Sequence, residues 1–266
     1  MSTSLPPETW GCVMTASNTE LVMLNTSATV FPTERSKGGK GGEGGNFQIT
    51  NAEFVAAVFP QLPEGGFAAV CSKAGDPSQG GWTCRRADLE VDGLSADTNN
   101  YISCSSFYPA SDGSFRARKS DFAACHFLML DDLGTKVPLD RLDGFELSWL
   151  IETSSGNYQA GIILSEPLID GAVAVRLLNA IIDAGLCDAG SRGPLSRWAR
   201  LPVAIKGKPK YLDEAGKPFQ CRLLEWLHDR RYTPDGIVGS LQLELAPSGR
   251  PKKATKSRKA SERLSP

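Results

Sequence analysis

Two adjacent carboxylates close an apolar run in the segment HFLMLDDLGTKVP, residues 126–138. A buried strand that ends in Asp131 and Asp132 needs a counter-charge or access to water at that end, because an unpaired buried charge is costly. Paired carboxylates can also hold a divalent ion, since hard cations such as Mg²⁺ prefer oxygen ligands. Two such ions about 3.5–4 Å apart would hold the attacking and leaving oxygens of a phosphoryl transfer. The simpler interpretation of such a pair is a strand-to-turn junction at the surface.

Strand geometry limits what the two aspartates can do together. Adjacent residues of a strand point to opposite faces of the sheet, so both carboxylates can serve one metal site only if the strand ends or bulges at Asp132. Gly134 makes such a bulge feasible. Without a bulge, one aspartate binds the metal, and the other either contacts the metal-binding residues without touching the metal or faces solvent.

Cationic side chains follow further along the chain. Arg197 and Arg200, in SRWARLP, offer forked donors for triphosphate oxygens. Lys206, Lys208 and Lys210, in KGKPK, alternate with other residues, so in an extended chain they share one face and suit a track of backbone phosphates. Acid, arginine and lysine together favour nucleotidyl transfer over hydrolysis of a neutral substrate. A surface ion pair at the arginines and a solvated turn at the lysines are the simpler alternatives.

Composition excludes several classes of protein. The 266 residues can bury a core, and the formal net charge of −1 gives no global field that would attract nucleic acid or an anionic membrane. Seven cysteines without a C-x-x-C pair argue against a zinc site and a disulfide framework, so reduced thiols are expected. No apolar run approaches the ~20 residues of a membrane span, and the N-terminus lacks the features of a signal peptide. We therefore expect a soluble, cytoplasmic protein without a membrane partner.

Three regions are expected along the chain. Residues 1–46 comprise an N-terminal segment and a flexible Gly-rich linker, ERSKGGKGGEGGN, which lacks the G-x-x-x-x-G-K-[ST] pattern of a phosphate-binding loop. Residues 47–245 form the folded domain. Residues 246–266 form a basic tail that is expected to be disordered and to add salt-dependent affinity for nucleic acid.

Helices and strands alternate irregularly in the folded domain. Helices are expected from Asn51, with that residue as cap, over 170–185, with Asp170 as cap, and from Thr233. Strands are expected at 66–72, 99–109, 126–131, 199–205 and 219–226, and as a pair within 145–167 joined by a turn at 154–157. Hairpins between neighbouring strands favour an α+β domain over a doubly wound parallel sheet.

Three motifs in this order, FLMLDDLGTKVP, WLIETSSGNYQAGIIL and RWARLPVAIKGKPK, resemble the RepB-like DNA primases of plasmids and phages, which belong to the archaeo-eukaryotic primase (primase-polymerase) superfamily. The resemblance runs from about residue 99 to about residue 232. It implies a two-layer primase-polymerase catalytic core with a sheet like that of the RNA-recognition motif. It also implies Mg²⁺ or Mn²⁺ as cofactor, nucleoside triphosphates as substrates, and primer or DNA synthesis on a single-stranded DNA template.

The resemblance assigns a metal-binding role to the acids. Asp131 and Asp132 stand where the superfamily has acid-x-acid, so their adjacency is a departure from the pattern. The superfamily's third acid precedes the arginine segment, and Asp188 is the candidate for it. Glu225, on an expected strand, is a rival for the same role.

The resemblance also assigns contacts to the incoming nucleotide. Gln159 stands at a position that is usually histidine and that touches the nucleotide phosphates, and a neutral amide makes a weaker, pH-insensitive contact there. Ser155 and Asn157, in the same motif, are expected to bind the nucleotide with it, as are Arg197 and Arg200. The segment RLPVAIKGKPK departs from the family's R-L-P-G-x-x-N-x-K pattern at its Gly and Asn positions.

Other interpretations remain open at this point. Arg116 and Arg118 are expected to steer the template strand, but charges that guard an edge strand look the same. The missing histidine and the adjacent acids are also consistent with a catalytically inactive single-strand or origin DNA-binding module, and the carboxylates with a metal-dependent nuclease. No Walker motif is present, so a helicase would be a partner or another part of a larger protein.

Overall fold

The computed structural model of the protein describes residues 47–247, so the expected linker at 34–46 and nearly all of the basic tail lie outside the described residues. The helices are α1 (Asn51–Val58), α2 (Ala87–Glu90), α3 (Gly171–Asp183) and α4 (Pro234–Ser240). The strands are β1 (Phe67–Lys73), β2 (Arg85–Arg86), β3 (Asn99–Phe107), β4 (Phe122–Leu133), β5 (Trp149–Ser154), β6 (Asn157–Leu168), β7 (Trp198–Arg200), β8 (Ile205–Lys206), β9 (Phe219–Gln220), β10 (Arg222–Trp226) and β11 (Arg231–Tyr232).

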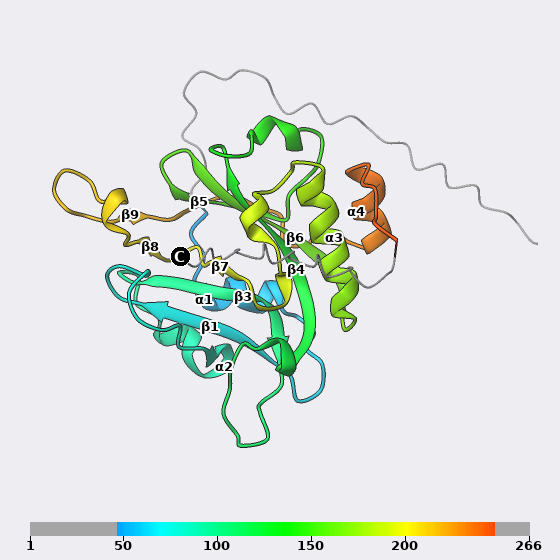
Figure 1. The fold of residues 1–266 in the computed structure, drawn as a ribbon. Helices are drawn as coiled ribbons and strands as arrows, with labels where there is room; N and C mark the ends of the chain where they lie inside the picture. Colours follow the sequence, from blue (N-terminus) through cyan, green and yellow to red (C-terminus); the bar gives the residue numbers. More distant parts are fainter. Residues whose placement is uncertain (1–46, 248–266) are drawn as a thin grey trace, which may run out of the picture. The chain divides into compact units, whose positions relative to one another are not determined.

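A curled, mostly antiparallel sheet forms the centre of the fold (Figure 1), with the strand order β10-β5-β6-β4-β3-β1-β2. Strand β3 pairs with β4 only through Ser105–Phe107, and its first half pairs with β7 instead. The sheet therefore opens between β3 and the far end of β4, and β7 lies in that opening. Strands β8 and β9 form a separate hairpin that extends away from the rest of the described residues (Figure 1).

Both faces of the sheet are covered by apolar side chains. Alternate residues of β4 point to opposite faces: Leu128 and Leu130 belong to one core, which α3 and α4 cover, whereas Phe127 and Met129 belong to a second core, which α1 covers. Helices α3 and α4 lie on the same side of β4 and β6 (Figure 1). Because both cores are fully buried around β4, its position and its register are tightly fixed, and with them the place where it ends.

The mixed α+β character expected from the sequence is confirmed, and most elements lie where they were expected. Helix α3 begins after Asp170, whose side chain accepts a hydrogen bond from the Ala172 amide, as predicted. Helix α1 is capped differently from the prediction. Its cap is Thr50, which forms a capping box with Glu53, so Asn51 is the first helical residue and instead bonds the Val203 backbone through both polar atoms of its amide. No helix within residues 47–247 has the length and hydropathy that crossing a membrane requires.

Strand β4 bulges at its end. Leu130 pairs with Ala160 and Leu133 pairs with Tyr158, so Asp131 and Asp132 together oppose the single residue Gln159. Asp132 has a φ of 55°, in the left-handed region that non-glycine residues seldom adopt. The bulge that the sequence made feasible is therefore present. It absorbs one residue, so Leu133 returns to the core face and is fully buried.

A tight turn follows the bulge and stabilises it. The backbone N–H groups of Lys136 and Val137 both donate to the Asp132 carbonyl, at 3.0 and 3.1 Å, and the Gly134 N–H donates to the Val137 carbonyl at 2.7 Å. Gly134 has a φ of 82°, and a Cβ atom there would lie 2.5 Å from the Gly156 carbonyl oxygen. Only glycine fits both the conformation and the space, so this residue links the turn to the neighbouring β5–β6 hairpin.

Replacing Gly134 with alanine should destabilise the protein by about 2–4 kcal/mol, because it adds steric overlap to the cost of a left-handed conformation. Gly113→Ala is the matched control: Gly113 has a φ of 78°, but a Cβ atom at that residue would meet no other atom within 4 Å, so about 1 kcal/mol is expected. Urea unfolding of both variants measures the difference. Equal effects of the two substitutions would contradict the close contact at Gly134.

Candidate active site

A cavity of about 840 Å³ lies at the opening of the sheet. Its volume is in the range of sites that hold a small ligand. It is lined by ten of the thirteen residues that the sequence singled out: Asp131, Asp132, Ser155, Asn157, Gln159, Arg197, Arg200, Lys206, Lys208 and Lys210. The structure therefore brings together the acidic motif, the hairpin motif and both basic motifs, which are far apart along the chain.

Asp131 lies on the cavity side of β4, in line with Phe127 and Met129, as strand alternation requires. Its carboxylate accepts hydrogen bonds from the Gln159 amide at 2.9 Å and from the Arg197 guanidinium at 3.1 Å. It also accepts the Asp132 backbone N–H at 3.0 Å, which becomes available because the bulge removes it from the strand ladder. The charge of Asp131 is thus balanced by one cation and two neutral donors.

Asp132 is turned by the bulge toward the β5–β6 turn. Its carboxylate accepts a hydrogen bond from the Asn157 amide at 3.1 Å and forms an ion pair with the Lys136 ammonium at 2.7 Å. Burial by itself raises the pKa of Asp132, but the hydrogen bonds from Lys136 and Asn157, together with the charges of Lys136 and Lys206, hold the pKa below the usual range. Asp132 is therefore ionised at neutral pH.

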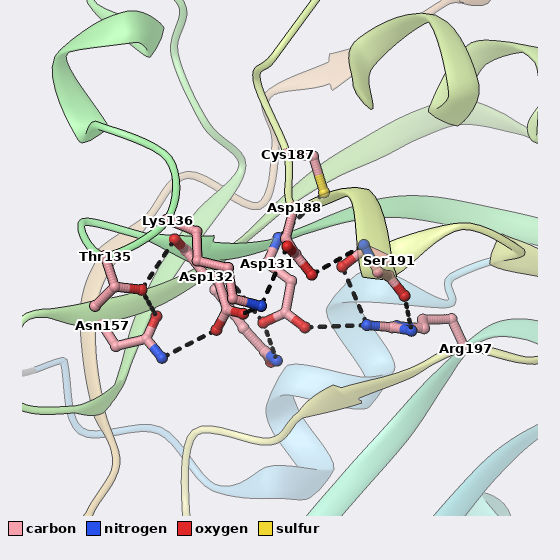
Figure 2. Close-up of polar contacts among 11 residues, drawn as sticks. Asp131, Asp132, Thr135, Lys136, Asn157, Cys187, Asp188, Ser191 and Arg197 are labelled. Atoms are coloured by element: carbon pink, nitrogen blue, oxygen red, sulfur yellow. Dashed lines mark hydrogen bonds and ion pairs between the residues drawn. The ribbon is translucent and has the colours of Figure 1, made fainter. Parts of the chain in front are cut away.

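Asp188 approaches the same place from the segment after α3. Its carboxylate caps a short 3₁₀ helix through the Gly190 N–H at 3.0 Å and lies 3.2 Å from the Lys136 ammonium. Its backbone N–H donates to the Asp131 carbonyl at 3.3 Å. The candidate third acid thus lies next to the other two, as Figure 2 shows. Neither Asp188 nor its rival Glu225, on β10, lines the cavity itself. Asp188 is the better candidate because it contacts the Asp131 backbone and Lys136.

Lys136 lies between two of the acids. Its ammonium contacts both Asp132 and Asp188, and these two carboxylates raise the pKa of the lysine above its usual range. The side chain is nonetheless 60% exposed, so it can leave this position without opening the core. Figure 2 shows Lys136 between Asp132 and Asp188, with Arg197 on the far side of Asp131.

The donors fit a divalent cation by their chemistry. Carboxylate oxygens are the ligands that Mg²⁺ and Mn²⁺ prefer, and the space between Asp132 and Asp188 already accommodates one positive charge, the ammonium of Lys136. As they are arranged, however, no three His, Cys, Asp or Glu side chains among residues 47–247 form a group that could hold a metal ion. A metal ion bound between Asp132 and Asp188 would therefore have to displace the Lys136 ammonium.

The hairpin motif supports the acids through amide groups. Both polar atoms of the Gln159 side chain are engaged, with its NH₂ donating to Asp131 and its oxygen accepting the Arg200 backbone N–H at 2.9 Å. Asn157 donates to Asp132, and its oxygen accepts the Thr135 hydroxyl at 3.3 Å. Ser155, at the tip of the turn, is exposed and lines the cavity.

The two arginines differ in their surroundings. Arg197 is partly exposed and forms an ion pair with Asp131. Its guanidinium also donates hydrogen bonds to the Ser191 hydroxyl and the Gly190 carbonyl. Arg200 is only 3% exposed. Its guanidinium donates to the Asn99 side chain and to the Ile205 carbonyl and lies over the Tyr101 ring, with 4.2 Å between the guanidinium carbon and the ring centroid. Arg200 therefore fixes the start of the lysine segment as well as lining the cavity.

The three lysines lie along one wall of the cavity. Lys206 is on β8, whereas Lys208 and Lys210 are at and after the start of a 3₁₀ helix, so only the first part of the segment is extended as expected. The ammonium groups of Lys206 and Lys210 both lie over the Tyr211 ring, at 4.9 and 4.6 Å from its centroid. Burial, together with the nearby Arg200, lowers the pKa of Lys206 to about 8.

Arg116 and Arg118 do not line this cavity. They are exposed on the segment between β3 and β4, beside a second cavity that also contains Trp82 and Trp198. Among the lining residues that the sequence did not single out are Lys136 and Trp82. Lys136 follows Asp132 by four residues in the quoted motif, a spacing that could have identified it, whereas nothing in the surrounding sequence points to Trp82.

No protein-family model and no curated protein matches the chain. Among solved structures, the primase RepB′ is similar at 16% identity and a TM-score of 0.47, with 72% of this chain and 61% of that chain covered. The AEP domain of the cyanophage S-2L primase-polymerase is similar at 12% identity and a TM-score of 0.48, with 72% and 96% covered. The catalytic domain of RepB′ in complex with initiator DNA is similar at 15% identity and a TM-score of 0.46, with 73% and 93% covered. The chain thus spans less than two thirds of the length of the first of these proteins.

Replacing Lys136 with alanine should tighten the binding of Mn²⁺ by roughly threefold to tenfold. The ammonium competes for the same carboxylates, and partly exposed ion pairs of this kind contribute about 0.2–1 kcal/mol each. Lys208→Ala is the control, since it removes a charge from the same cavity without a contact to the acids. Isothermal titration calorimetry with Mn²⁺ provides the measurement. Unchanged or weaker binding by the Lys136 variant, or equal tightening by the control, would contradict the competition.

Proposed function

We propose that the protein is a DNA primase-polymerase, which synthesises or extends primers on single-stranded DNA by metal-dependent nucleotidyl transfer in plasmid or phage replication. One observation carries the proposal: a bulge presents two carboxylates to a cavity that six cationic side chains also line, namely Lys136, Arg197, Arg200, Lys206, Lys208 and Lys210. An excess of positive charge around a small acidic centre fits a polyanionic substrate that binds together with a divalent cation.

The carboxylates of Asp131, Asp132 and Asp188 would hold Mg²⁺ or Mn²⁺. The bound metal would supply neutralisation of the charge that develops on the transferred phosphoryl group. Gln159 and Asn157 act as positioning residues, because each donates an amide N–H to one of the acids and so fixes its orientation. No side chain has to act as a covalent nucleophile, since positioning and electrostatic stabilisation are sufficient for such a transfer.

The cations have complementary tasks. Arg197 is partly exposed beside Asp131 and can exchange that contact for a phosphate oxygen. Lys206, Lys208 and Lys210 extend the positive wall outward and suit the triphosphate or the backbone of a nucleic acid strand. Arg200, which holds the backbone at Ile205, keeps the first of these lysines in place. Nucleoside triphosphates and single-stranded DNA are thus the proposed ligands, and a helicase is a proposed partner.

Isosteric replacement of the acids tests the proposal. Asp131→Asn and Asp132→Asn retain side-chain volume but remove the charge, and each should lower primer synthesis at least about 100-fold, because metal ligands contribute more than the residues that support them. Asp140→Asn, at an exposed position of the 3₁₀ helix Leu139–Leu142, is the control and should be active. Incorporation of labelled nucleotides on single-stranded DNA with Mn²⁺ or Mg²⁺, resolved on a gel, is the measurement.

The same assay separates the alternatives. Synthesis that survives both substitutions would refute the assignment of the acids. DNA binding that is indifferent to Mg²⁺, without nucleotide incorporation by the wild-type protein, would identify an inactive DNA-binding module. Degradation of labelled single strands in the absence of nucleotides would identify a nuclease.

Nucleotide use should weaken as the pH rises through about 8. Lys206 has its pKa lowered to about 8 from an ordinary 10.5, so it is charged below that pH and neutral above it. Loss of one charge-assisted hydrogen bond to a phosphate should lower kcat/KM about tenfold between pH 7 and 9. Lys206→Arg keeps its charge throughout this range and should remove this part of the pH dependence. An identical pH profile for the two proteins would exclude Lys206 from the contact.

A further inference from the structure

Three aromatic side chains form a cluster at the edge of the cavity. Trp82, from the segment between β1 and β2, has its ring centroid 4.8 Å from that of Tyr101 on β3 and 6.2 Å from that of Trp198 on β7. The two indoles are nearly parallel, with an interplanar angle of 18°. Trp82 is nonetheless 47% exposed, so much of this large apolar side chain is open to solvent and is not part of either core.

The two indoles separate two cavities. Trp82 and Trp198 line the acidic cavity of about 840 Å³ and also a neighbouring cavity of about 450 Å³, whose other lining residues include Phe115, Arg116 and Arg118. No carboxylate occurs among the described residues that line the smaller cavity. An extended ligand that passes over Trp82 would thus have arginines on one side and the lysines and acids of the candidate active site on the other.

Cations hold this arrangement in place. The Lys73 ammonium lies 4.9 Å from the Trp82 ring centroid and donates hydrogen bonds to the Pro77 carbonyl at 2.7 Å and the Gly80 carbonyl at 3.3 Å. It therefore fixes the segment that carries Trp82. Arg200 lies over the ring of Tyr101, another member of the cluster. Because the indole is held by these contacts, binding a flat partner on its exposed surface costs little ordering entropy.

We propose that Trp82, backed by Trp198, is a stacking platform for an unpaired base of single-stranded nucleic acid, with the strand's phosphates on Arg116 and Arg118 before the platform and on the lysine wall after it. Flat aromatic faces between cationic patches are the combination that single-strand binding uses, since every base has a π-face and every linkage a negative charge. An apolar peptide would use the indole but not the cationic groups on either side. The assignment deepens the proposed function and rests on it for the identity of the strand, a template.

Binding without nucleotide or divalent metal tests the platform independently of catalysis. Fluorescence anisotropy of a labelled oligothymidylate should show Trp82→Ala binding about fivefold to 150-fold more weakly than the wild type, as expected for the loss of one stacked base, about 1–3 kcal/mol. Trp82→Phe keeps an aromatic face and should retain most of the affinity. Leu89→Ala is the control, because Leu89 is 71% exposed on α2 and lines neither cavity. Thermal unfolding checks that each variant is folded.

Two further arms separate stacking from charge. On an abasic oligonucleotide with the same backbone, Trp82→Ala and the wild type should bind equally. In a salt series, Arg116→Ala should lower the slope of log affinity against log salt by about one, whereas Trp82→Ala should leave it unchanged.

The outcomes distinguish this inference from the proposed function. A loss below about threefold for Trp82→Ala on oligothymidylate, or an equal loss on the abasic strand, would overturn the platform even if primer synthesis is observed. A base-dependent loss in a protein that incorporates no nucleotides would support the platform and remove the primase-polymerase function.

Discussion

The arrangement of the site depends on a one-residue bulge at the end of a buried strand. A regular strand would send Asp131 to one face and Asp132 into the opposite core. Because Asp131 and Asp132 share the single partner Gln159, the chain gains one residue, both carboxylates reach the same side, and Leu133 still fills its place in the core. The energetic cost of the left-handed conformation of Asp132 is offset by the hydrogen bonds that its carbonyl oxygen accepts from two backbone N–H groups. The bulge therefore makes both carboxylates accessible from the cavity without disturbing the core packing that holds β4 in place.

The same geometry answers why a buried strand can end in two acids. Each carboxylate is paired before any ligand arrives: Asp131 with Arg197, and Asp132 with Lys136, which also reaches Asp188. Paired charges at an opening to solvent avoid most of the desolvation penalty that unpaired buried charges incur. In the proposed function, a metal ion would replace the Lys136 ammonium at the acids, and a phosphate oxygen would replace the Asp131 carboxylate at Arg197.

The sequence predicted those parts of the structure that local patterns determine. Local patterns predicted the helix at 170–185 from its apolar spacing and the turn at 154–157 from its residue types. They also showed that Gly134 makes a bulge at Asp132 feasible. Tertiary arrangement decided the rest. The burial of Arg200 and the separation of Arg116 and Arg118 from the acidic cavity depend on how the sheet opens between β3 and β4, which no local pattern encodes. Trp82 was missed for the same reason, because a loop with no periodicity brings it beside Trp198.

Gln159 holds the two halves of the sheet at a set separation. Its oxygen accepts the Arg200 backbone N–H of β7, while its NH₂ donates to Asp131 at the end of β4. Since the β7 amide can only donate, the orientation of the side-chain amide is determined and its NH₂ must face the acid. One neutral side chain thus bridges the opening between β4 and β7, and the length of the glutamine side chain sets the distance across this opening. A shorter or charged side chain at position 159 could not make both hydrogen bonds. The distance between the acids at the end of β4 and the basic segment that follows β7 would then change.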